Sequence, residues 1–247
     1  MTKEEFYTMA SPQKFQNIAK LLNEEERDIL KFKISRLCVS ELENDFELPK
    51  DFNQKAYLNI ALKCLSEIHP YKERVPPYGI VYKGRPSFMT DQLLFSLQAE
   101  AIKCREKAVI NIEQYITCAE TKEKNSIAEQ FEDLSELHNL VNQYAGNSKP
   151  SFISNYIYYD VEGQCSKPHI DNSFTAITVM VGLKHDYPDN RKTSSSIAYW
   201  SEMPRSEYKL FPGEISIFYG ASAIHGRTPV SNGEIVHSLL LSYRPII

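Results

Sequence analysis

Residues 168–172 read Pro-His-Ile-Asp-Asn, and residues 223–230 read Ala-Ile-His-Gly-Arg-Thr-Pro-Val. Side chains at positions i and i+2 of a β-strand point to the same face of a sheet. His169 and Asp171 therefore predict two ligands for one metal ion on one strand, and His225 predicts a third on a strand that the fold brings alongside. Two imidazoles and one carboxylate on one face of the metal, with the other positions open, are typical of non-haem Fe(II) sites.

The segments around these motifs have the pattern of β-strands. Aromatic and β-branched residues are frequent in 152–159, and 174–183 is typical of a buried strand. Further short strands are expected at 195–200, 214–219 and 235–243. Short strands at roughly ten-residue spacing, separated by Pro, Gly and Asp turns, favour a sandwich or a barrel.

The first part of the chain has a helical pattern instead. We expect helices over residues 24–42, 51–68, 91–119 and 126–144. In the last of these, apolar residues recur at spacings of three and four, which is typical of a helix with one buried face.

Two segments are expected to be surface loops. Residues 71–89 contain Pro and Gly and predict irregular or short-strand structure, with a plain connector favoured over a lid above a substrate. Residues 184–193 are polar and predict a solvated loop that contains His185.

The length of 247 residues suits one large domain or two small ones, and 42% hydrophobic residues are enough for a substantial core. We interpret the chain as one α+β domain, 1–247. In it, residues 1–148 form a mainly helical support or lid region, and residues 149–247 form the β core with the metal site.

Charge and cysteine content exclude several classes. The net charge is −4 and no Lys/Arg-rich run occurs, which argues against nucleic acid or a membrane surface as a partner. The five cysteines are widely spaced without a CxxC, so neither a disulfide framework nor a structural zinc site is indicated. No apolar run approaches the length of a membrane span, and the N-terminus lacks a signal-peptide pattern. We expect a cytoplasmic protein, and leave its oligomeric state open.

The order of motifs over about residues 150–247 resembles the Fe(II)/2-oxoglutarate-dependent dioxygenases, closest to their prolyl-hydroxylase-like branch. The matching elements are Tyr159-x-x-x-Gly163, His169-x-Asp171-Asn172, Pro212-Gly213-Glu214 before an apolar strand with Phe218, and His225-Gly226-x-x-Pro229-Val230-x-x-Gly233. The resemblance implies a double-stranded β-helix, or jelly roll, in the C-terminal half. It also implies that His169, Asp171 and His225 are iron ligands, with Fe(II), 2-oxoglutarate and O₂ as cofactor and co-substrates and ascorbate as a candidate reductant.

The same resemblance implies hydroxylation or another oxidation of a C–H bond, with succinate and CO₂ as co-products. Related halogenases have Gly or Ala where this chain has Asp171, so halogenation is disfavoured. No protein-docking module is evident, and we expect a small-molecule substrate, an amino acid or a derivative. The alternatives are a same-fold oxygenase with a different co-substrate, a protein or peptide hydroxylase, and a non-enzymatic metal- or ligand-binding barrel.

One position departs from the family pattern. The family commonly has an arginine just past the Gly of the final turn, where it binds the distal carboxylate of 2-oxoglutarate through a bidentate pair. Ile235 stands there instead. The candidates for this role are Arg244, Arg227, His237 and Lys184. A guanidinium matches a carboxylate best, so Arg244 is favoured, with Tyr159 as a hydrogen-bond partner of the same carboxylate.

Overall fold

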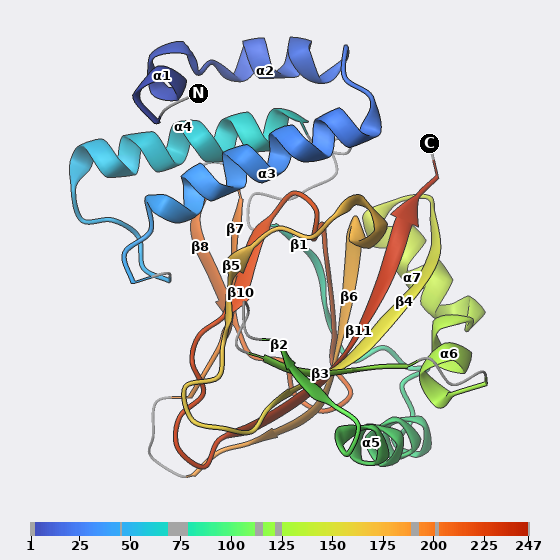
Figure 1. Cartoon of the computed structure of the whole chain (residues 1–247). Helices are drawn as coiled ribbons and strands as arrows, with labels where there is room; N and C mark the ends of the chain where they lie inside the picture. The colour runs from blue at the N-terminus through green and yellow to red at the C-terminus, as the bar shows by residue number, and fades with distance from the viewer. Residues whose placement is uncertain are drawn as a thin grey trace.

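The computed structural model describes residues 3–44, 46–68, 79–111, 116–121, 125–188, 193–200 and 203–246. Within these residues two antiparallel sheets, one of seven strands and one of four, enclose the interior of a jelly roll (Figure 1). Helices cover the outside of this barrel on two sides. The predicted α+β class and jelly-roll core are therefore confirmed.

The large sheet has β11 near its centre, paired with β4 on one side and β6 on the other. In spatial order its strands are β1 (Ile80–Gly84), β9 (Ile215–Phe218), β6 (Ile177–Asp186), β11 (Ile235–Pro245), β4 (Ser148–Tyr159), β3 (Ile116–Glu120) and β2 (Val109–Asn111). The edge strands β1 and β2, together with β3, come from the half that the sequence predicts to be mainly helical. The β core thus recruits strands from both halves of the chain.

The small sheet contains the two motifs that predict the metal ligands. Its strands, in spatial order, are β5 (Ser166–His169), β10 (Ile224–Arg227), β7 (Ser196–Trp200) and β8 (Met203–Tyr208). In this register His225 lies opposite His169 on one side and Ala198 on the other.

Three helices cover the outer face of the large sheet: α5 (Asp91–Arg105), α6 (Ile127–Glu132) and α7 (Ser135–Ala145). Their apolar faces and the outer face of the sheet form one buried cluster. Two buried tyrosines, one in β4 and one just after β9, also donate hydrogen bonds to helix carbonyls, Tyr158 to Ala101 at 2.7 Å and Tyr219 to Ala145 at 2.7 Å. These bonds satisfy phenols that would otherwise be costly to bury.

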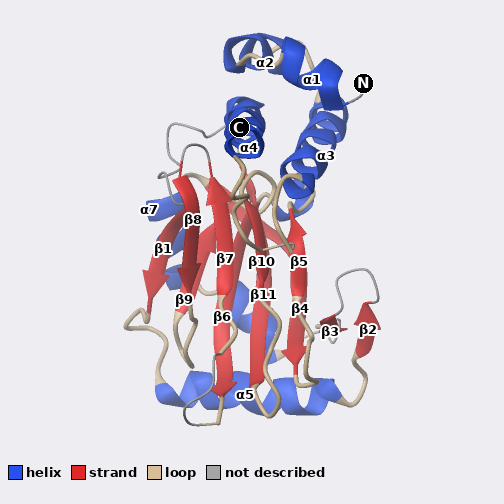
Figure 2. Ribbon diagram, turned by 90° about the vertical axis from the view of Figure 1, so that its left-hand side faces the viewer, coloured by secondary structure: helices blue, strands red, loops and turns tan. Residues whose placement is uncertain are grey.

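The N-terminal helices form a separate layer above the small sheet (Figure 2). They are α1 (Lys3–Met9), α2 (Pro12–Ala19), α3 (Glu24–Ser40) and α4 (Phe52–Ile68). A capping box between Asn23 and Glu26 begins α3. The apolar cluster of this layer includes Ile170, Ile197 and Ile224, all of which are next to or near site residues in the sequence.

Two helix predictions were wrong in part. The helix expected over 91–119 ends at Arg105, and β2 and β3 follow, because β-branched residues there fit the edge of the sheet better than a helix. The helix expected over 126–144 is two helices, since the backbone of Leu134 is extended and begins α7 anew. The helices expected over 24–42 and 51–68 are confirmed as α3 and α4.

The loop expected over 184–193 was also wrong at its start. Strand β6 continues to Asp186, and His185 is buried with a bond to Glu234. Residues 189–192 of that segment, and residues 71–78 of the other expected loop, lie outside the described residues. Among the helices that the structure describes, none has the length and apolar character needed to span a membrane.

Glu132 in α6 gives a test of this packing. The residue is 1% exposed, Oε1 has no hydrogen-bond partner among the described residues, and burial raises its pKa to about 7. Because the unfolded chain ionises near the ordinary value of 4.5, the protein loses stability as the pH rises from 4.5 to about 7. We expect Glu132→Gln to gain up to about 3 kcal/mol over the wild type across this range.

The measurement is urea unfolding of both proteins at pH 4.5 and pH 8. Glu106→Gln, at an exposed position, is the matched control. A Glu132→Gln variant whose stability follows the wild type at both pH values would contradict this assignment.

Candidate metal centre and adjoining cavity

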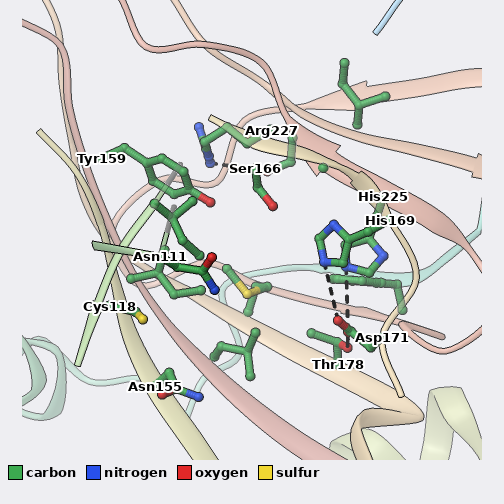
Figure 3. A pocket seen from close by; sticks show the side chains of 18 of the residues that line it. Asn111, Cys118, Asn155, Tyr159, Ser166, His169, Asp171, Thr178, His225 and Arg227 are labelled. Atoms are coloured by element: carbon green, nitrogen blue, oxygen red, sulfur yellow. Dashed lines mark hydrogen bonds and ion pairs between the residues drawn. The ribbon is translucent and has the colours of Figure 1, made fainter. Parts of the chain in front are cut away.

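Three side chains from two neighbouring stretches of the small sheet converge on one point. His169 is the last residue of β5, Asp171 follows two residues later, and His225 lies in β10. The nitrogen and oxygen atoms that they offer lie within 4.8 Å of one another. Asp171 is 3.5 Å from Nε2 of His169 and 3.6 Å from Nε2 of His225 (Figure 3). The three residues predicted as ligands are thus brought together in a geometry that could hold a metal ion.

Backbone carbonyls fix which imidazole nitrogen is available. Nδ1 of His169 lies 2.7 Å from the carbonyl of Lys167, and Nδ1 of His225 lies 2.9 Å from the carbonyl of Ala223. A carbonyl oxygen only accepts, so each Nδ1 carries the hydrogen and each Nε2 presents a lone pair. This is the tautomer that a metal ligand requires.

The carboxylate of Asp171 is held from the large sheet. Thr178 of β6 donates a 2.8 Å hydrogen bond to Oδ2, and the Asp171 N–H donates to the carbonyl of Gly220 at 2.8 Å. Gly220 has to lack a side chain, because a Cβ there would overlap both the Asp171 carboxylate and the Thr178 hydroxyl.

The pKa shifts of Asp171 and His225 suit metal binding. Burial lowers the pKa of His169, but Asp171 and the Lys167 carbonyl outweigh it and raise the value, so a metal ion competes with a proton there. Burial would raise the pKa of Asp171, but His225, His169 and Thr178 outweigh it and hold the value at about 2. Burial lowers the pKa of His225 to about 4 against the attraction of Asp171. At neutral pH Asp171 is therefore ionised and His225 neutral, which is the charge pattern that a divalent cation needs.

A cavity of about 260 Å³ adjoins the triad between the two sheets. Apolar side chains of Ile157, Met180 and Leu240 line part of its wall. Away from the triad the cavity reaches Arg227 and Tyr159, which lie close together in Figure 3.

Arg227 is a buried cation in this cavity. It is 4% exposed, and it donates to the hydroxyls of Ser194 at 2.9 Å and Ser196 at 3.2 Å. Its guanidinium carbon lies 5.3 Å from the ring centroid of Tyr159, itself 3% exposed. In the part of the chain that the structure describes, no carboxylate forms an ion pair with Arg227. Because burying a guanidinium without a direct ion-pair partner is costly, this position is suited to an anionic ligand.

The other candidates for the carboxylate partner lie elsewhere. The guanidinium of Arg244 stacks 4.9 Å above the ring of Phe174 and does not line the cavity. His237 packs edge-on against Tyr158, and Lys184 pairs with Asp186 at 3.0 Å. The structure therefore brings Tyr159 and Arg227 to the cavity, but not Arg244, the residue that the sequence favoured.

The sequence contained a signal for Arg227. It stands two residues after His225 on β10, so the same alternation that joins His169 to Asp171 places it on the metal-facing side. Thr178 is a polar residue in a buried strand, and its role beside Asp171 is evident only in the folded chain. Gly220 carries no recognisable signal, because its requirement comes from a close approach in three dimensions.

No protein-family model matches the chain, and no curated protein sequence matches it significantly. Solved structures do match. A prolyl-4-hydroxylase from Pseudomonas putida covers 74% of this chain and 100% of its own, at 13% identity and a TM-score of 0.55. SnoN, a non-haem α-ketoglutarate-dependent epimerase of nogalamycin biosynthesis, also matches. The match covers 75% of this chain and 83% of SnoN, with 16% sequence identity and a TM-score of 0.58. The third is a prolyl hydroxylase from Trichoplax adhaerens, solved with a hypoxia-inducible-factor peptide. The match covers 70% of this chain and 86% of that chain, with 13% sequence identity and a TM-score of 0.55.

Sequence identities of this size establish a shared fold rather than a shared substrate. The chain has the jelly-roll fold of these iron- and 2-oxoglutarate-dependent oxygenases.

Removal of the Thr178 hydroxyl tests whether its hydrogen bond to Asp171 contributes to metal affinity. Thr178→Val keeps the shape of the side chain but leaves Oδ2 of Asp171 without its donor. We expect the affinity for Fe(II) or Co(II) to fall about 10- to 100-fold, as is usual when a partner of a metal ligand is lost. Metal titration followed by calorimetry measures this.

Ser242→Ala is the matched control, because it removes a buried hydroxyl opposite Thr178 on β11 whose hydrogen bond goes to Thr175. Equal metal affinity in Thr178→Val and the wild type would exclude this role for the hydroxyl.

Proposed function

We propose that the chain is an Fe(II)- and 2-oxoglutarate-dependent dioxygenase that hydroxylates, or otherwise oxidises, a C–H bond of a small molecule. The observation that carries this proposal is one cavity with a potential metal triad at one end and a buried guanidinium at the other.

His169, Asp171 and His225 fit Fe(II) by donor type and number, since two imidazoles and one carboxylate leave coordination positions open. Bound iron would supply the oxidation, in which O₂ and 2-oxoglutarate are consumed and succinate and CO₂ are released. The protein keeps the Nε2 lone pairs and the ionised Asp171 directed at one point, so little reorganisation is needed on binding.

Arg227 and Tyr159 are proposed to bind the distal carboxylate of 2-oxoglutarate. The planar guanidinium matches a carboxylate, and the buried site strengthens the attraction because water does not screen it. Burial raises the pKa of Tyr159 to about 12 although Arg227 opposes the shift, so the phenol stays protonated and can donate. Charge also favours a dianion, since a divalent cation, Asp171 and Arg227 at the cavity wall would together be net positive.

The cavity supports a small substrate. Its volume of about 260 Å³ lies below the range of roughly 300–1,000 Å³ for sites of drug-sized ligands. A co-substrate and one small reacting group would fill this space. An amino acid or a derivative fits this size. A protein or peptide hydroxylase is the second candidate, in which only one side chain of the substrate would enter.

The alternative of a different co-substrate rests on Ile235, which occupies the usual arginine position. Arg227 supplies a guanidinium from β10 instead, so that reason no longer favours the alternative.

The central experiment mixes Fe(II)-loaded protein with 2-oxoglutarate under anaerobic conditions. A visible metal-to-ligand charge-transfer band is expected, followed by succinate formation when O₂ and substrates are added. His169→Ala should abolish both. A wild-type protein that binds Fe(II) but shows neither the band nor consumption of 2-oxoglutarate would refute the proposal.

Two arginine variants separate the candidates for the carboxylate partner. Arg227→Met should weaken 2-oxoglutarate binding about 10- to 100-fold, the usual effect of losing hydrogen bonds from a charged group. Arg244→Met is the matched control, because its guanidinium lies over Phe174 and outside the cavity. Titration of the charge-transfer band gives both dissociation constants, and the reverse order of effects would assign the role to Arg244.

A further inference from the structure

We infer that Glu234, acting through the hydroxyl of Ser194, is a positioning residue that fixes the Arg227 guanidinium for the distal carboxylate of 2-oxoglutarate. This inference rests on the proposed function and adds to it a second layer of residues behind the cavity.

Glu234 is a carboxylate in the protein interior, with a side chain that is 0% exposed. Ser194 gives it three contacts, from its N–H at 2.9 and 3.0 Å to the two oxygens and from its hydroxyl at 2.7 Å. His185 lies 3.0 Å from Oε1 through Nε2, and the N–H of Ser231 donates to Oε2 at 2.9 Å. So many donors stabilise the ionised form, and they lower its pKa although burial acts in the opposite direction.

The chemistry of these groups fixes the direction of the hydrogen bonds. An ionised carboxylate only accepts, so the single hydrogen of the Ser194 hydroxyl points to Glu234. The lone pairs of that oxygen then accept from Nη1 of Arg227 at 2.9 Å. A hydroxyl that donates to a carboxylate is a stronger acceptor, so the negative charge of Glu234 acts on Arg227 through Ser194.

We call this chain of hydrogen bonds, from Arg227 through Ser194 to Glu234, the relay. The hydroxyl that separates the two charged groups leaves Arg227 able to bind a ligand. A direct ion pair with Glu234 would neutralise Arg227 and occupy its N–H donors. With Ser194 between them, the guanidinium is attracted and oriented, while Ser194 and Ser196 use only two of its five N–H groups. The remaining donors are available to a ligand carboxylate in the cavity that Arg227 lines.

The relay joins three segments that are distant in the sequence. Ser194 comes shortly before β7, Arg227 ends β10, and Glu234 immediately precedes β11. It therefore also ties strands of the small sheet to the central strand of the large one. Ser194 and Glu234 could therefore stabilise the fold as well as position Arg227. Ligands with and without a distal carboxylate distinguish these two roles.

The experiment compares two 2-oxo acids on Fe(II)-loaded protein without O₂, followed by the charge-transfer band. 2-Oxoglutarate has a distal carboxylate, and 2-oxobutyrate lacks one, so only the former needs Arg227. In Ser194→Ala we expect the dissociation constant of 2-oxoglutarate to rise about three- to tenfold, the effect of one lost hydrogen bond. The dissociation constant of 2-oxobutyrate should not change.

Three further variants complete the design. Ser194→Thr keeps the hydroxyl and should bind 2-oxoglutarate more tightly than Ser194→Ala. Glu234→Gln removes the negative charge but keeps a hydrogen-bond acceptor. It should weaken the binding of 2-oxoglutarate and leave the binding of 2-oxobutyrate unchanged. Ser195→Ala changes a neighbouring buried serine whose backbone bonds to Thr228, and should behave as the wild type.

In turnover assays, the Ser194→Ala defect should appear in the KM for 2-oxoglutarate rather than in kcat. Unchanged 2-oxoglutarate affinity in Ser194→Ala would overturn the inference and leave the proposed function intact. An equal loss of affinity for both 2-oxo acids would also overturn the inference, because that result would indicate general damage to the fold. A wild-type protein that binds iron but not 2-oxoglutarate would refute the proposed function, and this inference with it.

Discussion

The register of β10 between β5 and β7 is the constraint on which the site depends. In this register His225 faces His169, and Arg227, two residues later, faces the same interior. A shift of one residue would turn both side chains to the opposite face. Gly226 between them permits the close approach of the strands, since a Cβ there would overlap the carbonyl of Ser166. One four-residue strand thus places a predicted metal ligand and a cation at the two ends of a single cavity.

The interior of the barrel has an uneven charge distribution. Near the triad, a carboxylate and neutral imidazole nitrogens offer electron pairs to a cation. At the other end, a guanidinium and a phenol offer hydrogens to an anion. Apolar side chains lie between these ends and keep the dielectric constant low, so that each end acts strongly on a ligand with the matching group. A molecule with a metal-chelating group and a distant carboxylate satisfies both ends at once.

The sequence predicts the parts of this site that follow from local geometry. The i and i+2 spacing of His169 and Asp171 depends only on the strand, and the later histidine completes the triad. Arg227 follows the same rule, yet the sequence favoured Arg244 because chemical type alone cannot show which face of the barrel a residue occupies. Glu234 and Ser194 are separated by 40 residues and meet only in the folded chain.

The fold likewise has parts that local sequence predicts and parts that depend on distant residues. The long helices α3 and α4 are evident from composition, whereas β2 and β3 look like the continuation of a helix until they join the sheet beside β4. Short edge strands have few residues to display a pattern, and their pairing is decided by partners far away in the sequence.

The N-terminal helical layer has a consequence for the energetics of the metal centre. Asp28 of α3 accepts a hydrogen bond from the N–H of Ser173, just after the His-x-Asp motif, at 3.2 Å. Ile170, between the two predicted ligands of that motif, belongs to the same apolar cluster as α3 and α4. Binding at the triad and docking of these helices therefore share residues and are thermodynamically linked. Metal binding at the triad would therefore stabilise the docked helices, and the helical layer would contribute to metal affinity without providing a ligand.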